Sequence, residues 1–272
     1  TPPELLNPLY TALAQRNQLD PALVSEVILG CVTQHGEQAG NIAKTSALFA
    51  GWPESVCGLT VHRFCSSSVD AIALAGLKVA TGQTQAIVAG GVESITMTLK
   101  SMNMDNLFNP LLQQDNPGIY YPMGKTAEIV ASRYGVTREA QDAYALQSQQ
   151  RTARAQAAGL YADEIAPMAV KYQVEDKATG EKRIVDGVVE ADDCNRPDTT
   201  LESLAKLQPA FDPAGSVTAG NASQLSDGAS MTLVMSLDKA LELGLTPKAY
   251  FRGFTVAGCE PDEMGIGPGY SV

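Results

Sequence analysis

The sequence predicts an α/β protein whose parallel or mixed sheet is covered by helices on both faces. Two continuous apolar runs, residues 27–32 and 86–90, are typical of buried strands. Apolar residues at helical spacing over 40–51 and 66–81 separate them, with a further short strand at 59–64. Because strand and helix alternate along the chain, we expect strands joined by right-handed crossovers.

Helical segments are also predicted before and after the first strand. Apolar side chains recur at helical intervals over residues 3–16, and Asp20-Pro21 starts a short turn or helix, because proline suits the first helical position. The helix at 40–51 ends where Gly51 and Pro53 interrupt the pattern.

The alternation of strand and helix stops after residue 94. Residues 97–121 are rich in Met, Asn, Gln and Pro and have no clear period, which predicts an irregular inserted segment. Further on, Thr137 suits the N-cap of a long helix and Gly159 its end. The elements predicted here are helices at 125–134 and 138–158 and a β-hairpin at 170–193 that turns at 178–180.

Regular alternation resumes towards the end of the chain. It restarts at residues 216–219, and small residues predict a turn directly after them. The apolar residues that follow have helical spacing. The elements predicted there are a helix-like segment at 227–236, a helix at 238–243 capped by Gly244, a strand at 249–257 and a helix that begins at Asp262.

Composition and charge exclude several classes of function. The 19 Lys and Arg against 30 Asp and Glu give a net charge of −11, which argues against non-specific nucleic-acid binding. No apolar run has the length of a membrane span, and no secretory signal is visible at the N-terminus. The 5 cysteines are scattered and lack metal-ligand spacing, which indicates a reduced intracellular compartment and no metal site. Since no Met starts the chain, we expect it to be processed or incomplete.

Cys65 is the strongest candidate for a reactive residue. It stands where the strand at 59–64 gives way to the helix at 66–81, and the serine run 66–68 suits an N-cap. Free N–H groups and the positive dipole at a helix N-terminus stabilise a thiolate over a thiol. The residues alone leave two interpretations open: a nucleophile, or a small buried cysteine that packs the end of a strand.

Several stretches resemble the thiolases, which cleave or form 3-ketoacyl-CoA. Val61-His-Arg-Phe-Cys-Ser-Ser-Ser-Val-Asp-Ala-Ile72 with Gly90-Gly-Val-Glu-Ser94 is similar to their acyl-enzyme signature. Other stretches resemble thiolase motifs in the expected order: 32–41, 123–128, 138–145, 199–206, 209–211, 217–223 and 264–268. The resemblance implies a layered αβαβα core, a mixed sheet covered by helices, with an inserted α/β loop domain.

The resemblance also implies a domain layout. Residues 1–94 and 215–245 would form the first half of a duplicated core. Residues 95–214 would be the inserted loop domain that covers CoA, and residues 246–272 would begin the second half of the core. We therefore expect a thiolase that lacks its first strand and most of its C-terminal half.

By this resemblance the protein is an acetyl-CoA C-acyltransferase in which Cys65 accepts the acyl group as a thioester. CoA and acyl-CoA would be its substrates, with no permanently bound cofactor. Thiolases carry Asn-Glu-Ala-Phe, Gly-His-Pro and Cys-Gly-Gly motifs in their second half, and none of these occurs here. The two histidines, His35 and His62, lie in other motifs, and His62 stands where thiolases usually have Asn. We therefore expect the isolated chain to have no thiolytic turnover.

The resemblance further implies a binding site for CoA and its acyl group. An arginine and a serine would hold the nucleotide end, an aromatic ring would pack beside it, small residues would follow the pantetheine, and two methionines would line the acyl pocket. In that order these are Arg196 and Ser203, Phe211, Ala219, Gly220 and Ser223, and Met123 and Met264. Without the resemblance, Arg196 would be read as a solvated charge, Ser203 as a helix-start residue and Phe211 as a core aromatic.

Two departures from the family pattern bear on the substrate. Ser68 replaces a common Gly and Pro122 a common His, and both favour the β-oxidation type over the biosynthetic acetoacetyl-CoA type.

Two further classes of function stay open for a chain with these motifs. One is a non-catalytic relative that binds acyl-CoA or lipid, and the second is a ketoacyl synthase, which generally lacks the Asn-Ala-Ser turn at 221–223. Family habit implies a homodimer or homotetramer, with a β-oxidation multifunctional subunit as a possible partner. The expected location is cytoplasmic, or mitochondrial or peroxisomal in a eukaryote.

Overall fold

The computed structural model describes residues 1–99, 102–177 and 179–272 and contains two compact units. Unit 1 comprises Thr1–Met102, Ala166–Ala191 and Leu225–Gly253, and unit 2 comprises Asn103–Ile165, Asp192–Gln224 and Phe254–Val272. Ala178 of the predicted hairpin turn, and residues 100 and 101 of the predicted irregular segment, lie outside the described residues. The domain boundaries implied by the family resemblance stay a prediction.

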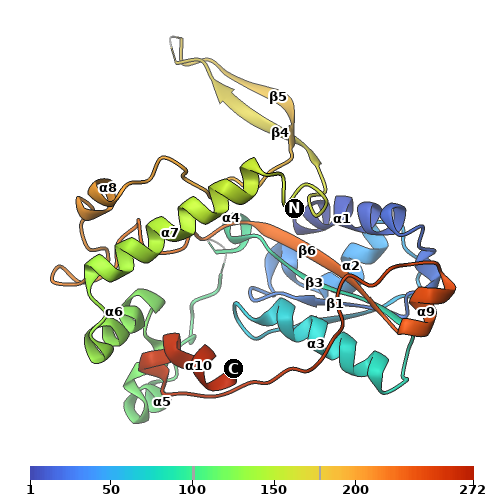
Figure 1. Cartoon of the computed structure of the whole chain (residues 1–272), viewed down its shortest axis with the longest axis horizontal. Helices are drawn as coiled ribbons and strands as arrows, with labels where there is room; N and C mark the ends of the chain where they lie inside the picture. Colours follow the sequence, from blue (N-terminus) through green and yellow to red (C-terminus); the bar gives the residue numbers. More distant parts are fainter. Residues whose placement is uncertain (100–101, 178) are drawn as a thin grey trace. The chain divides into compact units, whose positions relative to one another are not determined.

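Unit 1 is built on a four-stranded mixed sheet in the order β2-β1-β3-β6 (Figure 1). Strands β1 (Glu26–Gly30), β2 (Cys57–Val61) and β3 (Ala86–Glu93) are parallel, and β6 (Gly228–Met235) runs antiparallel to β3. Gly30 of β1 is level with Val61 and Gly91 in the sheet register, so the three parallel strands end at one edge.

Helices cover both faces of this sheet, as the sequence predicts. On one face α1 (Pro2–Arg16) and α2 (Ile42–Phe49) bury Leu6, Tyr10 and Ile42 against Val27, Leu29 and Val88. On the other face α3 (Ser67–Ala80) packs Ala71 and Ala75 onto Ile28, Ile87 and Ala89. Small alanines on α3 bring the helix close to the sheet, and both layers exclude water from apolar side chains. The predicted α/β class with a mixed, helix-covered sheet is confirmed.

The helix-like segment predicted at 227–236 is wrong, because these residues form strand β6. Ala229, Met231 and Leu233 recur at every second position and pack against the α1 face of the sheet. Strand β3 supplies hydrogen-bond partners along the whole length of β6. The long-range pairing therefore overrides a local spacing that also fits a helix.

One other expectation near the end of the chain is corrected. Residues 249–257 form no strand. Strands need a hydrogen-bonded neighbour, and among the described residues none pairs with this segment. The ring of Phe251 instead lies against Gly76 of α3, where a Cβ atom would come within 2.8 Å of it.

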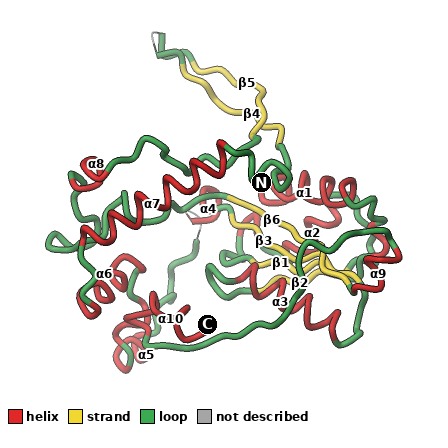
Figure 2. Tube along the Cα trace, viewed as in Figure 1, coloured by secondary structure: helices red, strands yellow, loops and turns green. Residues whose placement is uncertain are grey.

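Unit 2 is mainly helical (Figure 2). Its longest elements are α6 (Met123–Tyr134), which ends at the left-handed Gly135, and α7 (Arg138–Ala157), capped by the Thr137 hydroxyl as predicted. The shorter elements of the unit are α5 (Pro110–Asp115), η4 (Pro117–Tyr120), α8 (Leu201–Ala205), η5 (Pro261–Ile266) and α10 (Gly267–Ser271). The helix expected from Asp262 corresponds to η5 and α10.

The remaining elements belong to unit 1. The predicted hairpin is present as β4 (Met168–Glu175) and β5 (Lys182–Val189), which among the described residues pair only with each other. The others are η1 (Pro21–Leu23), η2 (Gly36–Gln38), α4 (Ile95–Thr98) and α9 (Leu237–Glu242). None of the helices in the described part of the chain has the length and apolar character needed to cross a bilayer.

Candidate active site

Cys65 lies in the turn that joins β2 to α3, at the edge where the parallel strands end. Its side chain is exposed, so the interpretation as a buried packing cysteine is wrong. The preceding residue, Phe64, has a φ of 46°, a left-handed conformation that non-glycine residues rarely adopt. Such strained positions concentrate at functional sites. The carboxyl edge of parallel strands is also where α/β proteins usually bind ligands.

The turn around Cys65 is held by short hydrogen bonds. The Ser67 hydroxyl donates to the Phe64 carbonyl at 2.6 Å and accepts the Arg63 N–H at 2.7 Å. The backbone N–H groups of Ser66 and Ser67 donate to the carbonyls of Arg63 and Phe64. These bonds fix the backbone on both sides of the thiol.

Side chains around the turn add two further contacts. The Arg63 guanidinium pairs with Asp70 in the first turn of α3 at 2.7 Å. The ring of His62 meets the exposed Phe64 ring edge-on, with centroids 4.7 Å apart. His62 thus contacts an aromatic side chain next to the candidate nucleophile, and its imidazole belongs to the outer surface of the turn.

The start of α3 leaves backbone donors free beside Cys65. Ser66 is the N-cap residue, but its hydroxyl makes no capping bond, so this part of the serine prediction is wrong. Among the described residues, the N–H groups of Ser68 and Val69 find no acceptor. Unpaired donors of this kind, with the helix dipole, stabilise an anion at a helix N-terminus. The arrangement is suited to a thiolate and to a developing oxyanion.

Two glycines let the start of α3 sit directly on the strand ends. A Cβ atom on Gly30 would lie 2.4 Å from the carbonyl carbon of Ser67 and 2.5 Å from the Ser68 nitrogen. On Gly91 it would lie 2.0 Å from the Ser68 hydroxyl oxygen. Because no side chain fits at either position, glycine sets how closely the nucleophile's helix approaches the sheet.

Cys31, directly after β1, is an unreactive thiol in the same unit. It is 1% exposed, and burial raises the pKa of its thiol to about 12, with the nearby Glu93 carboxylate adding to the shift. A thiol so far from ionisation at neutral pH is a poor nucleophile. Exposure therefore separates Cys65 from Cys31.

The sequence analysis missed a polar network at the same edge of the sheet. The Glu93 carboxylate accepts from the N–H of Val32 at 2.8 Å and from the side-chain amide of Gln38 at 2.8 Å. Gln38 is fully buried, and its carbonyl oxygen accepts the N–H of Ser94. Both residues stand inside the motifs that resemble thiolases, but only the folded structure reveals that they contact each other.

The residues predicted to bind CoA all belong to unit 2, whereas Cys65 belongs to unit 1. Most of their side chains are exposed. Met123 is the first residue of α6, and Met264 lies in η5, which packs against α6. Ala219, Gly220 and Ser223 lie in the loop that follows Thr218.

For three of these residues the sequence also allowed a purely structural role, and their contacts in the fold test that role. Ser203 completes a capping box with Thr200 at the start of α8, which is the helix-start role. Phe211 is 53% exposed, so it is no core aromatic, and its ring covers Gly124 so closely that a Cβ atom there would clash. Arg196 is exposed, and its guanidinium makes no ion pair or hydrogen bond with the described residues. It is free to bind an anion.

Polar side chains that the sequence analysis did not single out hold the 216–221 loop. The Glu128 carboxylate on α6 accepts from the N–H groups of Ser216 and Val217, at 2.9 and 2.7 Å. The Asn221 side chain accepts the Thr218 N–H at 2.7 Å and donates to the Ser216 carbonyl and to Asp142 at 3.0 Å. These bonds fix the loop that contains the exposed Ala219 and the half-buried Gly220.

Arg138 links the same network to α8. Its guanidinium pairs with Asp142 at 2.8 Å and donates to the carbonyls of Leu204 and Leu207. Asp142 is 4% exposed, so this carboxylate depends on Arg138 and Asn221 for its hydrogen bonds. Gly220 in turn packs against the side chains of Leu204 and Leu207.

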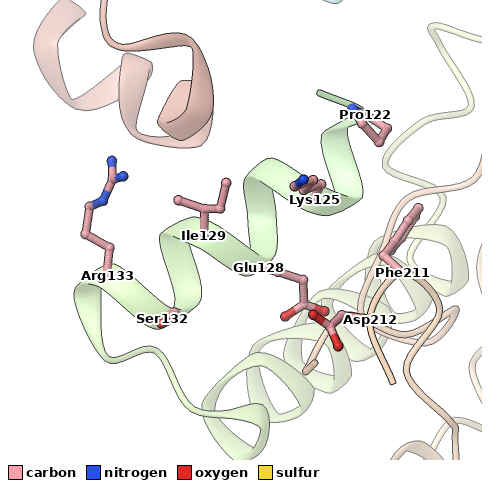
Figure 3. Close-up of a pocket in the computed structure, with 8 residues that line it drawn as sticks. All are labelled: Pro122, Lys125, Glu128, Ile129, Ser132, Arg133, Phe211 and Asp212. Carbon is pink, nitrogen blue, oxygen red and sulfur yellow. The ribbon is translucent and has the colours of Figure 1, made fainter. Parts of the chain in front are cut away.

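Unit 2 also carries a hollow of about 710 Å³ along α6 (Figure 3). Of the residues predicted to bind CoA, only Phe211 lines it. The Lys125 ammonium at its rim stacks 4.0 Å from the centre of the Tyr121 ring. The lining residues are Pro122, Lys125, Glu128, Ile129, Ser132, Arg133, Phe211 and Asp212. In the described part of the chain, no three His, Cys, Asp or Glu side chains gather as metal ligands would.

Comparison with known protein families identifies the family of this chain. A family model described as the thiolase N-terminal domain matches residues 1–238. The chain belongs to the thiolase family. The resemblance of its motifs is therefore confirmed.

Individual thiolases match over nearly the whole chain. A "3-ketoacyl-CoA thiolase" of Colwellia psychrerythraea is 44% identical over 94% of this chain and 64% of its own length. A "Beta-ketoadipyl-CoA thiolase" of Pseudomonas aeruginosa is 42% identical over 94% of the chain and 66% of its own length. A "3-ketoacyl-CoA thiolase B, peroxisomal" of mouse is 42% identical over 100% of the chain and 63% of its own length.

The fold agrees with that of a solved crystal structure. The "acetyl-CoA acetyltransferase" of Bacillus anthracis is 37% identical, with a TM-score of 0.85 over 100% of this chain and 68% of that one. The thiolase-like layered fold is thus confirmed for the part that is present. The chain spans about two thirds of the length of the curated relatives it matches.

Proposed function

We propose that the protein is a thiolase-type acyltransferase in which Cys65 carries the acyl group. The observation that carries this proposal is the exposed Cys65 thiol at the start of α3, beside unpaired backbone N–H groups. Membership of the thiolase family supplies the reaction class. The substrates would be CoA and 3-ketoacyl-CoA thioesters, with no permanently bound cofactor.

The reaction proceeds in two half-reactions through one covalent intermediate. The Cys65 thiolate attacks the ketone carbon of 3-ketoacyl-CoA, and the carbon–carbon bond next to it breaks. The acyl group stays on Sγ, and the electron pair leaves with acetyl-CoA as an enolate, which takes up a proton from an acid. A second CoA then attacks the acyl-cysteine through its sulfur, which releases the shortened acyl-CoA and returns the thiolate.

The residues of this chain supply part of that chemistry. The free N–H groups at the start of α3 suit the oxyanion that forms when the carbonyl is attacked. In unit 2, the Arg196 guanidinium, which has no partner among the described residues, suits the nucleotide end of CoA, with Ser203 and Phe211 near it by family position. Ala219, Gly220 and Ser223 would follow the pantetheine, and Met123 and Met264 would contact the acyl chain.

The acid and base of the reaction are not assigned to residues of this chain. The only histidines are His35 and His62, and His35 already bonds the Thr98 carbonyl at 3.0 Å. We therefore expect the 272-residue chain alone to bind or accept acyl groups without turnover. Measurable 3-ketoacyl-CoA cleavage by this chain would contradict that expectation.

The acyl-enzyme itself is the direct test of the proposal. The product of the complete gene is incubated with acetyl-CoA, and intact-protein mass spectrometry should find one acetyl group that hydroxylamine removes. Peptide mapping should place it on Cys65, and Cys65→Ser should lose it. Wild-type protein without a thioester, or with the acetyl group on Cys57 or Cys194, would show that the proposal is wrong.

The physiological substrate is proposed from the family pattern. Ser68 and Pro122 favour the β-oxidation type, and several relatives are named 3-ketoacyl-CoA thiolase. The alternative, an acetoacetyl-CoA enzyme, is supported by the name of the matching Bacillus anthracis structure. A series of 3-ketoacyl-CoA chain lengths on the complete gene product decides between them, because strict preference for the shortest substrate favours the alternative.

Assembly and location follow the same reasoning. We expect a homodimer or homotetramer that acts on CoA thioesters, alone or beside a β-oxidation multifunctional subunit. The location would be cytoplasmic, or mitochondrial or peroxisomal in a eukaryote, and two matched relatives are named as peroxisomal. Sedimentation of the purified complete protein measures the assembly.

A further inference from the structure

We propose that Ser67 is a positioning residue that holds Cys65 in its reactive place. The serine follows Cys65 by two positions, and its side chain never needs to contact the substrate. It acts through the backbone of the turn that carries the thiol. This role rests on the proposed function of Cys65, but it can be tested without any turnover.

The first argument is the pair of hydrogen bonds made by one hydroxyl. Ser67 Oγ donates to the Phe64 carbonyl at 2.6 Å and accepts the Arg63 N–H at 2.7 Å. Both backbone groups that it bonds, the Arg63 N–H and the Phe64 carbonyl, come just before Cys65 in the sequence. A single hydroxyl therefore closes the turn across Cys65, using its donor and one acceptor position.

The second argument is the conformation that these bonds maintain. Phe64 has a φ of 46°, and its side chain is 70% exposed, so no packing of the ring against a core compensates this unusual backbone. The bond from Ser67 Oγ ends on the carbonyl of this same residue. Without the hydroxyl, the turn can relax towards ordinary backbone angles and carry Cys65 away from the free N–H groups of α3.

The third argument is that Ser67 itself cannot move. The residue is 4% exposed and lies where β1 approaches α3 so closely that a Cβ atom on Gly30 would be 2.7 Å from the Ser67 Cβ. A hydroxyl fixed in this way gives the turn one geometry. The neighbouring serines differ, since Ser66 is exposed and its hydroxyl makes no capping bond.

The test measures the alkylation of individual cysteines in the intact 272-residue chain. Iodoacetamide is added over a range of pH, and mass spectrometry follows each thiol separately. Exposed Cys57 and Cys194 serve as reference thiols, and buried Cys31 reports on folding, because it should stay unlabelled. The variants are Ser67→Ala, its rescue Ser67→Thr, and the matched control Ser66→Ala.

We expect Cys65 to react faster than Cys57 in the wild type. In Ser67→Ala the rate for Cys65 at neutral pH should fall about fivefold, the value of roughly one hydrogen bond. Ser66→Ala should leave this rate unchanged, and Ser67→Thr should recover most of the loss. The rates of Cys57 and Cys194 should stay constant throughout.

Several results would overturn the role of Ser67. They are an unchanged Cys65 rate in Ser67→Ala, an equal loss in Ser66→Ala, or a wild-type Cys65 that reacts no faster than Cys57. Labelling of Cys31 in Ser67→Ala would mean that this variant is partly unfolded. In that case Ser67→Thr is compared with Ser67→Val, because threonine and valine have the same shape and differ in the hydroxyl. Equal Cys65 rates in that pair would also overturn it. Failure of the proposed function is a separate outcome, since it would appear as a missing acetyl thioester.

Discussion

The Cys65 turn and the 216–221 loop are both irregular segments, but they are held in place by different means. The turn is closed by residues within a few positions of one another, such as Ser67 and Phe64, and by glycines that let backbone approach backbone. The loop is held by side chains from distant parts of the sequence, such as Glu128 and Asp142. The first segment therefore depends on close backbone packing, and the second on buried polar contacts.

The largest loss of stability is expected from Arg138→Ala, which removes polar contacts in unit 2. The change leaves the Asp142 carboxylate buried without its ion pair and the carbonyls of Leu204 and Leu207 without a donor. Removal of one partner of a buried pair typically costs about 3–5 kcal/mol of unfolding free energy. Hydrogen exchange should accelerate in α8 and in residues 216–221, while the sheet of unit 1 keeps its protection.

The matched control for this prediction is Arg151→Ala on the same helix. Arg151 is exposed, and its side chain makes no ion pair with the described residues, so its loss should leave exchange nearly unchanged. If both variants behaved alike, the loop would not depend on the Arg138 network.

A somewhat smaller loss of stability is expected from Gly30→Ala, which disrupts the close backbone packing in unit 1. The new methyl group would overlap backbone atoms of Ser67 and Ser68, which cannot move away as a flexible side chain could. Overpacking of this kind costs roughly 1–3 kcal/mol. Urea unfolding should show the loss, and Cys65 alkylation should change with it, because the start of α3 must shift.

Gly228→Ala is the control for overpacking. Gly228 begins β6, and a Cβ atom there would meet nothing within 4 Å. Its unfolding midpoint should stay close to that of the wild type. A destabilisation equal to that of Gly30→Ala would show that glycine loss, and not the contact with α3, causes the effect.

Alkali should weaken unit 1 through Tyr10. Burial raises the pKa of this phenol to about 12, against an ordinary value of 10.0, although its bond to Ser46 opposes the shift. Because the folded pKa is the higher one, the contribution is fully present below about pH 10 and is lost as pH rises towards 12. Two pKa units correspond to roughly 3 kcal/mol. The urea midpoint should therefore fall more steeply in wild type than in Tyr10→Phe between about pH 10 and 12.

The sequence predicted best where structure follows from local pattern. The helices around residues 3–16, 66–81 and 138–158 and the place of Cys65 at a strand-to-helix turn needed only spacing, caps and breakers, whereas the exposure of its thiol came from the fold. Strand β6 was predicted as helical because its pairing with β3 joins residues more than 130 positions apart. Local spacing contains no information about such a partner.

The same distinction applies to the candidate site. Glu128 lies within a stretch recognised as thiolase-like, but the hydrogen bonds that its carboxylate accepts from the 216–217 segment cross almost 90 residues of sequence. A carboxylate on a helix is usually a solvated side chain, so nothing near it indicated this role. The sequence located the segments of the site, and the fold identified the residues that hold them.

The smallest effect is expected from acid, which should loosen η5 in unit 2. The hydrogen bond from the Arg133 guanidinium holds the pKa of the Asp262 carboxyl below its ordinary value. The folded pKa is the lower one, so the contribution is present above about pH 4 and is lost as pH falls through the folded pKa. Hydrogen exchange, corrected for its intrinsic pH dependence, should rise at residues 261–271 on acidification, whereas α7 should change little.

The variant Asp262→Asn should already exchange faster at neutral pH and should respond less to acid. The control is Asp198→Asn, which changes an exposed carboxylate that has no ion pair among the described residues, and it should resemble wild type. If η5 responded to acid equally in wild type and in Asp262→Asn, the buried Glu263, which bonds Arg133 and Tyr134, would hold this segment instead.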